Sequence, residues 1–360
     1  MNHDEKNNCM FNDDGSCDWQ PPPRCPELGS EFITELETNF HKGFKWINLL
    51  RTDLSFPVNN QIGFELASFS VSKTSDTYIA NDLQTFSNID TENIPWTLAV
   101  LGINWQMKNS SLFIGIRNVN EDYFTSPCTA LFTNSSCGIF PTISANYPIA
   151  NYPVASVGID YKLNLKKWFL ETSIYNGTGY RNLSGKDNIF RFCPQTDGIF
   201  SITSLNYQNY GNSYFMGIAL YNGMFPSNEV GNQEETIKTQ KKGMNATLWT
   251  YAEQTLVAQV KVLAQYSINT PRNKGCRYYL GTGLILSTTR SEGGFFIDYA
   301  DFSSMGECAC EITWKFPCLK NGYLQPALHF IKNTYGQNLV GMIRFGYNLN
   351  WNAHKSQSTF

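Results

Sequence analysis

A two-residue alternation between apolar and polar side chains runs through this sequence from about residue 30 to residue 351, and it limits the folds open to the chain. In the segment 307–316, one set of alternate positions holds Glu307, Ala309, Glu311, Thr313 and Lys315. The other set holds Cys308, Cys310, Ile312, Trp314 and Phe316. Successive side chains of a β-strand point to opposite faces, so the two faces of such a strand meet different surroundings. The alternation predicts an all-β chain.

The alternating runs are also long. The run 339–351 keeps its large apolar residues on one face, and the runs 155–163 and 323–330 show the same separation. Soluble strands are typically about 5–6 residues long, whereas tilted strands that cross a membrane need about 9–11. A soluble β-sandwich binding module shares the local alternation and is one alternative. The length favours lipid on one face and water on the other, and predicts a transmembrane antiparallel β-barrel.

The composition agrees with a wall between lipid and water. Charged residues make up 16% of the chain and aromatic residues 14%, yet the mean hydropathy is negative, at -0.31. Soluble domains carry about 25% charged residues. No stretch approaches the roughly 18 consecutive apolar residues of a membrane-spanning helix. The net charge of -3 gives no reason to expect binding to nucleic acid.

The sequence carries no motif of a familiar catalytic site. The patterns GxSxG, HExxH and GxxxxGKS/T are absent, and there are only four histidines. Zinc sites use CxxC pairs or cysteines close to histidines, and neither arrangement is present. We therefore expect no enzymatic activity, no cofactor and no metal.

Three segments are expected along the chain. Residues 1–29 form a polar, cysteine-containing extension, residues 30–351 form the barrel, and residues 352–360 form a polar tail. Within the barrel, the very polar segment 228–242 is expected to be a loop outside the membrane, and the pair Asn222-Gly223 a turn. The N-terminus shows no apolar core of a signal peptide, so we expect a mature form or a start downstream of the leader.

The chain contains ten cysteines. Five of them lie in expected extensions and loops: Cys9, Cys17, Cys25, Cys128 and Cys137. Disulfides form in exported proteins, so these five are interpreted as disulfide formers, with Cys128 bonded to Cys137 across a loop. Cys308 and Cys310 lie on the apolar face of their strand, where free thiols serve as small apolar residues.

Five segments carry recognisable motifs. They are 82–89 (DLQTFSNI), 112–124 (LFIGIRNVNEDYF), 131–141 (LFTNSSCGIFP), 152–155 (YPVA) and 323–326 (YLQP). In this order they resemble the carbohydrate-selective outer-membrane porin family, the glucose-type porins, over most of the chain. The resemblance implies a barrel of about 16 strands in a bacterial outer membrane. The N-terminal extension and Cys137, which stands within the family's NSSFG turn, depart from the family pattern.

The resemblance also indicates pore residues. Arg117 lies on the face opposite Leu112, Ile114 and Ile116, and it aligns with the basic residue that lines the family's constriction. By parity, further polar side chains face the lumen: Asp160, Lys162, Glu171, Lys261, Gln265, Glu307, Glu311, Lys315, His329 and Arg344. Mixed charges and weak hydrogen bonding suit a neutral sugar, whereas the alternative role for each residue is a structural bond between strands.

Four tryptophans are assigned to the interfacial girdle rather than to the pore: Trp96, Trp105, Trp168 and Trp314.

The function expected from these observations is facilitated diffusion of carbohydrates through an outer-membrane porin. The alternatives are a general porin and a disulfide-linked structural protein of the envelope. The expected partners are sugars or other small polar solutes, outer-membrane lipid, and either further copies of the chain or disulfide-linked envelope proteins.

Overall fold

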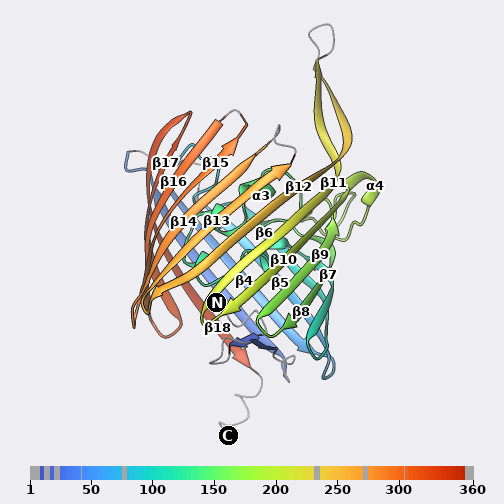
Figure 1. The fold of residues 1–360 in the computed structure, drawn as a ribbon, viewed down its shortest axis with the longest axis horizontal. Coiled ribbons are helices and arrows are strands. Elements are labelled where there is room, and N and C mark those ends of the chain that lie inside the picture. Colours follow the sequence, from blue (N-terminus) through green and yellow to red (C-terminus); the bar gives the residue numbers. More distant parts are fainter. Residues whose placement is uncertain are drawn as a thin grey trace.

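The barrel prediction is confirmed in a computed structural model of the chain (Figure 1). Sixteen antiparallel strands, β3 to β18, form one closed sheet in chain order, and β18 pairs with β3 to close it. The structure describes residues 9–11, 17–19, 25–41, 43–74, 79–230, 236–270, 275–303 and 305–352. Because a closed barrel has no free sheet edge, every backbone group at membrane depth can be paired.

The strands have the following bounds: β1 (Cys9–Phe11), β2 (Cys17–Trp19), β3 (Glu27–Thr38), β4 (Phe44–Pro57), β5 (Ile62–Lys73), β6 (Ile94–Gln106), β7 (Ser110–Arg117), β8 (Ser156–Leu165), β9 (Trp168–Asn176), β10 (Ile199–Asn209), β11 (Asn212–Val230), β12 (Thr236–Val257), β13 (Val260–Thr270), β14 (Tyr278–Ser287), β15 (Glu292–Phe302), β16 (Met305–Cys318), β17 (Gly322–Asn333) and β18 (Gly336–Asn352). Short helices interrupt the connections: η1 (Val119–Glu121), η2 (Thr129–Leu131), α2 (Ser135–Gly138), α3 (Pro141–Ser144) and α4 (Pro194–Asp197). No helix in the described ranges is long and apolar enough to cross a membrane.

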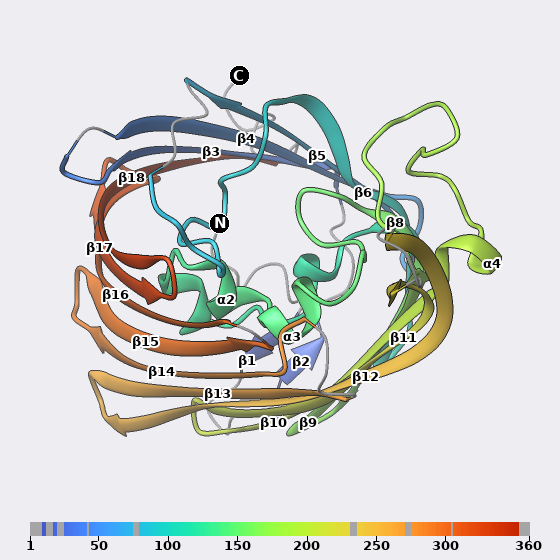
Figure 2. The same cartoon turned by 90° about the horizontal axis from the view of Figure 1, so that it is seen from above.

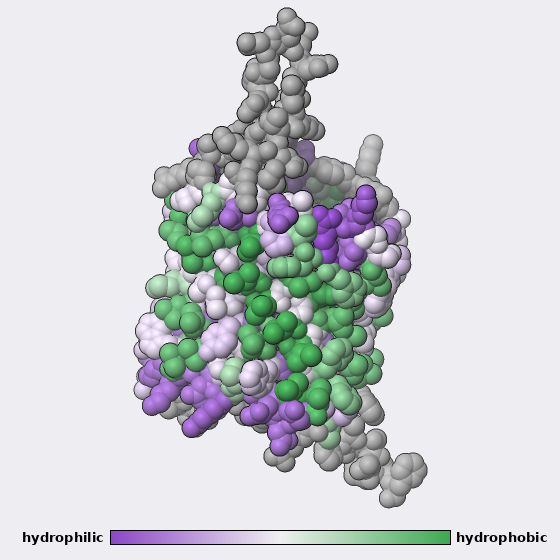
Figure 3. Space-filling view, turned by 90° about the vertical axis from the view of Figure 1, so that its right-hand side faces the viewer, coloured by the Kyte–Doolittle hydropathy of each residue, from purple (hydrophilic) through white to green (hydrophobic). Residues whose placement is uncertain are grey.

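The strands have the two chemically different faces that the sequence predicts. On β17, Leu324, Leu328 and Phe330 are about two-fifths exposed on the outer wall, whereas Gln325 and His329 are buried on the inner one. Figure 3 shows apolar side chains gathered over the middle of one outer face, with hydrophilic residues towards its lower end. The outer wall is therefore suited to lipid.

The two ends of the barrel differ in their connections. At the end where the barrel sheet begins and ends, neighbouring strands are joined by short turns such as residues 166–167 and 210–211. At the other end lie three long connections, residues 74–93, 118–155 and 177–198. In barrels of this kind the short turns face the periplasm and the longer loops face outward. The long connections therefore mark the extracellular end.

The segment 228–242 extends beyond the barrel rim as expected (Figure 1), but the expectation of a loop is wrong for its described residues, 228–230 and 236–242, which are strand. Strands β11 and β12 pair from Ser213 with Glu253 as far as Val230 with Thr236, and Figure 1 shows their hairpin rising above the rim. The expected turn at Asn222-Gly223 is wrong as well, because both residues lie inside β11. Gly223 sits where a Cβ would meet the Tyr221 hydroxyl at 2.4 Å, so the glycine marks close packing in a strand rather than a turn.

The connection between β7 and β8, residues 118–155, folds into the barrel and is called the lumen loop here. Figure 2 shows it inside the ring of strands, with α2 and α3. Its apolar side chains pack against inward-facing aromatic residues of the β9–β15 wall. The Phe124 ring centroid, for example, lies 4.7 Å from that of Phe140 and 4.8 Å from that of Trp249. One half of the barrel interior is therefore a packed hydrophobic cluster.

Candidate functional site

The lumen loop directly follows Arg117, the last residue of β7. The Arg117 guanidinium donates to both carboxylate oxygens of Asp122, lies 3.3 Å from Glu65 of β5, and stacks over the Phe113 ring at 4.7 Å. The chain turns back through η1 between Arg117 and Asp122, so this ion pair fixes the first turn of the loop. A two-pronged arginine–carboxylate pair restricts geometry as well as adding binding energy.

Strands β8 and β9 bring three further charges to the same place. The Lys162 ammonium lies 2.6 Å from Asp122 and 3.1 Å from Glu171, its cross-strand partner. Asp160 accepts a 2.6 Å hydrogen bond from Ser173, whose hydroxyl lies 2.7 Å from that of Tyr123. We call Glu65, Arg117, Asp122, Asp160, Lys162 and Glu171 the charge cluster.

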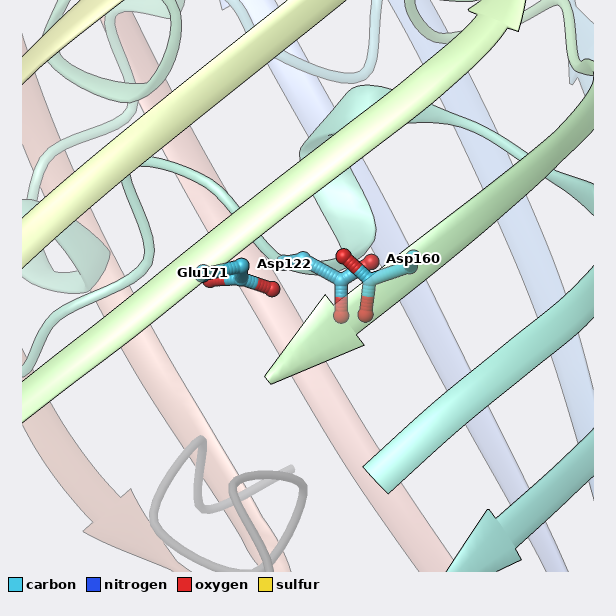
Figure 4. A group of neighbouring side chains, drawn as sticks. All are labelled: Asp122, Asp160 and Glu171. Atoms are coloured by element: carbon cyan, nitrogen blue, oxygen red, sulfur yellow. The ribbon is translucent and has the colours of Figure 1, made fainter. Parts of the chain in front are cut away.

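Three carboxylates of the charge cluster could be considered as metal ligands. One oxygen each of Asp122, Asp160 and Glu171 lies within 4.8 Å of the others, and Figure 4 shows the three side chains converging. However, the Lys162 ammonium already contacts two of these carboxylates, so a cation is built into the cluster. The arrangement fits an internal ion-pair network better than a metal centre.

Asp122 is the member of the cluster that lies outside the strands. Burial acts to raise the pKa of its carboxyl, but Arg117 and Lys162 together hold that pKa below its ordinary value of 3.8. Asp122 therefore stays ionised throughout the neutral range, and the ion pairs that fix the start of the lumen loop persist.

A second bridge joins the lumen loop to the wall. Arg51 of β4 donates to both carboxylate oxygens of Glu121 in η1, at 2.7 and 2.9 Å, and to Asp53 at 2.7 Å. Sequence reasoning missed Arg51 and Glu121. Arg51 has the same inward parity as Leu49 and Asp53, so an extension of the parity argument to β4 would have found it.

Several cations of this region keep contact with solvent. The side chains of Arg51, Arg117 and Lys162 are 16%, 13% and 13% exposed, and that of Glu65 is 29% exposed. The Asp122 side chain is only 1% exposed. The three basic side chains and Glu65 are thus accessible to a solute, and the buried carboxylates hold the basic groups in place.

Glu307 and Glu311 lie away from the charge cluster and bind loop backbone. Glu311 accepts hydrogen bonds from the backbone N–H groups of Thr133, at 2.9 Å, and Asn134, at 3.1 Å. Glu307 accepts from the backbone N–H groups of Leu83, at 2.7 Å, and Gln84, at 3.0 Å. The two carboxylates therefore fasten the lumen loop and the β5–β6 connection to β16.

The other residues assigned to the pore are also apart from the cluster. Arg344 forms an ion pair with Glu35 and donates to Asn88 at 2.6 Å, while Lys261 is half-buried on β13. The remaining three contact neighbours: Gln265 donates to the Cys137 carbonyl at 3.0 Å, His329 lies 3.1 Å from the Thr133 hydroxyl, and Lys315 lies over the Tyr323 ring at 4.0 Å.

The tryptophan assignment agrees with the structure. Trp96, Trp105 and Trp168 are 51%, 46% and 45% exposed on the outer wall near strand ends, and Trp314 is half-buried on the same outer side of β16. These positions suit an interfacial girdle.

The expected Cys128–Cys137 disulfide is wrong. Both thiols are free and buried in the hydrophobic cluster between the lumen loop and the wall, where they act as small apolar residues. All eight cysteines whose side chains the structure describes are free, including Cys25, and the side chains of Cys9 and Cys17 lie outside the described residues. Cys308 and Cys310 are free thiols on the outer wall, as predicted.

A closed barrel of sixteen strands, apolar outside, with an inward-folded loop and paired charges inside, defines an outer-membrane porin. The model of the OprB family of carbohydrate-selective porins matches residues 104–352. The chain belongs to this family, and it is a carbohydrate porin of a bacterial outer membrane.

Solved structures show the same fold. The high-pH structure of Pseudomonas putida OprB matches with a TM-score of 0.73 and 14% identity, over 90% of this chain and 94% of that one. A loop-deletion mutant of Vibrio cholerae OmpT matches with a TM-score of 0.59 and 8% identity, over 90% and 99%. A mutant of the Rh. blastica porin matches with a TM-score of 0.58 and 8% identity, over 90% and 100%. No curated protein matches the chain in sequence.

Proposed function

We propose that neutral, polyhydroxylated solutes diffuse passively past η1, between the lumen loop and the β4–β8 wall, and that Arg51, Glu65, Arg117 and Lys162 contact them on the way. The observation that carries this proposal is the combination of partial exposure and fixed ion pairing in these side chains. Their hydrogen-bonding groups remain available to a solute, while the paired charges limit the pull on any one ion.

The chemistry of the proposed constriction suits weak binding. A sugar hydroxyl can accept a hydrogen bond from a guanidinium or ammonium group and donate one to a carboxylate. These side chains can therefore replace the water shell of the sugar. Conduction requires that solute also leaves, and side chains already engaged with Asp122 or Glu121 can give only part of their bonding capacity. We infer that the chain acts as a channel and not as an enzyme, since family and fold both favour a channel.

The test is conductance of the purified full chain in a planar bilayer, with increasing glucose or maltose on one side. We expect sugar to reduce the ion current. Arg117→Gln removes the charge and leaves a weaker hydrogen-bond donor. The expected loss of binding free energy for the sugar is about 1 kcal/mol, which is roughly a five-fold weaker apparent affinity. Arg277→Gln is the matched control, because Arg277 pairs with Asp301 at the extracellular rim, 2.5 Å away.

Current that does not respond to sugar in the unmodified chain would favour a general porin instead. Equal sugar affinities in both variants would remove Arg117 from the solute path. The disulfide-linked envelope protein gains no support from the described cysteines, and oligomerisation of the barrel is a separate proposal that chemical cross-linking in membranes tests.

A further inference from the structure

Part of the lipid-facing side of the barrel is covered by the chain itself. Ile114 and Ile116 share the outer face of β7, yet Ile114 is 53% exposed and Ile116 only 3%. On the neighbouring strand, Val157 has the outward parity of Ile159, which is 48% exposed, but Val157 is itself partly buried. Some part of the chain therefore lies over the outer wall near the extracellular ends of β7 and β8.

The covering segment is the β9–β10 connection, residues 177–198, called the collar loop here. Ile189 of the collar loop is fully buried against Leu98, Ile116 and Ala155. Figure 2 shows this loop outside the ring of strands, beside β6 and β8, with α4 at its outer edge. The collar loop thus folds outward and back over the wall, whereas the lumen loop folds inward.

Polar contacts hold the collar loop in this position. Tyr180 and Ala155 exchange two backbone hydrogen bonds, of 2.8 and 2.9 Å, just before β8 begins. The Thr97 hydroxyl of β6 donates to the Arg181 carbonyl at 3.1 Å, and the Arg181 side chain pairs with Glu92. Attachment at β6, β8 and β9 gives the loop a defined place on the outer surface.

The collar loop presents large apolar side chains on its own surface. Leu183, Phe190 and Phe192 are 47%, 50% and 63% exposed. In water this exposure would be unfavourable, because apolar surface in contact with water costs free energy in proportion to its area. The loop, however, is seated on the outer wall, whose apolar surface continues along β8 and β9 in Ile159 and Ile174, 48% and 54% exposed.

From this placement we propose that the collar loop is an interfacial anchor that inserts Phe190 and Phe192 among the lipids of the outer leaflet. The apolar surface of the loop continues the surface of the barrel that faces lipid, so the same lipid layer is the occupant that fits it. Aromatic and apolar side chains beside polar groups are the usual composition of a segment at a membrane interface. The same loop carries the cationic residues Lys186 and Arg191, and Arg191 is paired with Asp197 at 3.0 Å.

The test is photocross-linking of the full chain in vesicles of phosphatidylglycerol and fluorescent phosphatidylethanolamine. Benzoylphenylalanine replaces Phe190 in one variant and Phe192 in another. Phe295, 41% exposed on the outer face of β15, gives the positive control, and Tyr335, 58% exposed in the β17–β18 turn, gives the water-exposed control. Heat-modifiable migration on gels verifies that each variant is folded. If one of the two test variants does not fold, the other still tests the proposal.

We expect fluorescent lipid adducts at residues 190 and 192 in yields similar to that at residue 295, and at least about ten-fold above that at residue 335. Two results would overturn the proposal. Yields no higher than at residue 335 would place the loop in water. Adducts between two chains in place of lipid adducts would make the collar loop a contact surface for a second copy.

Discussion

Replacing Glu311 with alanine tests how the lumen loop is held inside the barrel. The Glu311 carboxylate is buried and accepts from the backbone N–H groups of Thr133 and Asn134, and from the Thr133 hydroxyl at 3.0 Å. Alanine at this position leaves those two backbone donors without the carboxylate. The barrel strands lose no backbone hydrogen bond, so the change acts on the loop rather than on the sheet.

The size of the effect follows from the hydrogen bonds that are lost. A buried donor without an acceptor costs about 1–3 kcal/mol, so two donors that share one carboxylate cost about 3 kcal/mol together. Each 1.4 kcal/mol is a factor of about ten, and the undocked fraction of the loop should therefore rise about 100-fold. The hydrophobic cluster around Phe124 is unchanged, so the docked form should still predominate.

Single-channel recording measures this change directly. Glu311→Ala should show frequent brief steps in current, and hydrogen exchange at Thr133 and Asn134 should accelerate about 100-fold. Glu292→Ala, an exposed carboxylate at the start of β15, should behave like the unmodified chain. Unchanged current noise together with unchanged exchange in Glu311→Ala would show that this carboxylate does not hold the loop.

Three further predictions concern the loops. Phe124→Ala should weaken docking of the lumen loop by about 3–5 kcal/mol, which limited proteolysis of that loop reports while the barrel stays folded. Burial raises the pKa of the Cys128 and Cys137 thiols, so maleimide should label neither at neutral pH until the chain is unfolded. A disulfide between them, detected by mass spectrometry, would contradict the free thiols. Burial acts to raise the pKa of Asp197, but hydrogen bonds from Asn176, Thr196 and Arg191 lower it below 3.8. This stabilisation of the collar loop should be complete above that pH and lost only as the pH falls through the lowered pKa, which hydrogen exchange in the loop measures.

The barrel could be predicted because its cause is local. Alternation along one strand, as in 307–316 or 339–351, depends only on which environments its two faces meet, and a sequence shows this directly. The number of strands came from the family resemblance and agrees with the closed sheet of sixteen. Arg117, Asp160, Lys162 and Glu171 were chosen by the same parity, and the structure brings them together.

What the alternation does not report is the partner of an inward-facing residue. Glu311 and Thr133 are 178 positions apart in sequence, and Glu307 and Leu83 are 224 apart. A polar inward residue looks the same in the sequence whether water, solute or a folded loop lies against it. The path of the lumen loop decides between these, and that path depends on packing between distant segments.

The inner wall itself contains a signal that explains where the lumen loop goes. In a lumen filled with water throughout, inward positions should be polar on every strand. Instead, the inward positions of β9 to β14 include Tyr175, Phe200, Tyr221, Trp249 and Tyr279, all buried. Aromatic side chains that face inward need an apolar partner, and the loop residues Phe124, Phe140 and Tyr147 provide one.

The two halves of the inner wall thus contribute differently to the proposed pore. The aromatic half holds the lumen loop to one side by hydrophobic burial, which is insensitive to the charge of a passing solute. The opposite half, with Arg51, Arg117 and Lys162, contacts the loop through ion pairs to Glu121 and Asp122 and through the Tyr152 ring, which lies 5.2 Å from that of Phe69; the three cations stay partly exposed. Because the aromatic half docks the lumen loop without these cations, we expect single changes at Arg51, Arg117 or Lys162 to alter the proposed solute contacts while the loop stays docked.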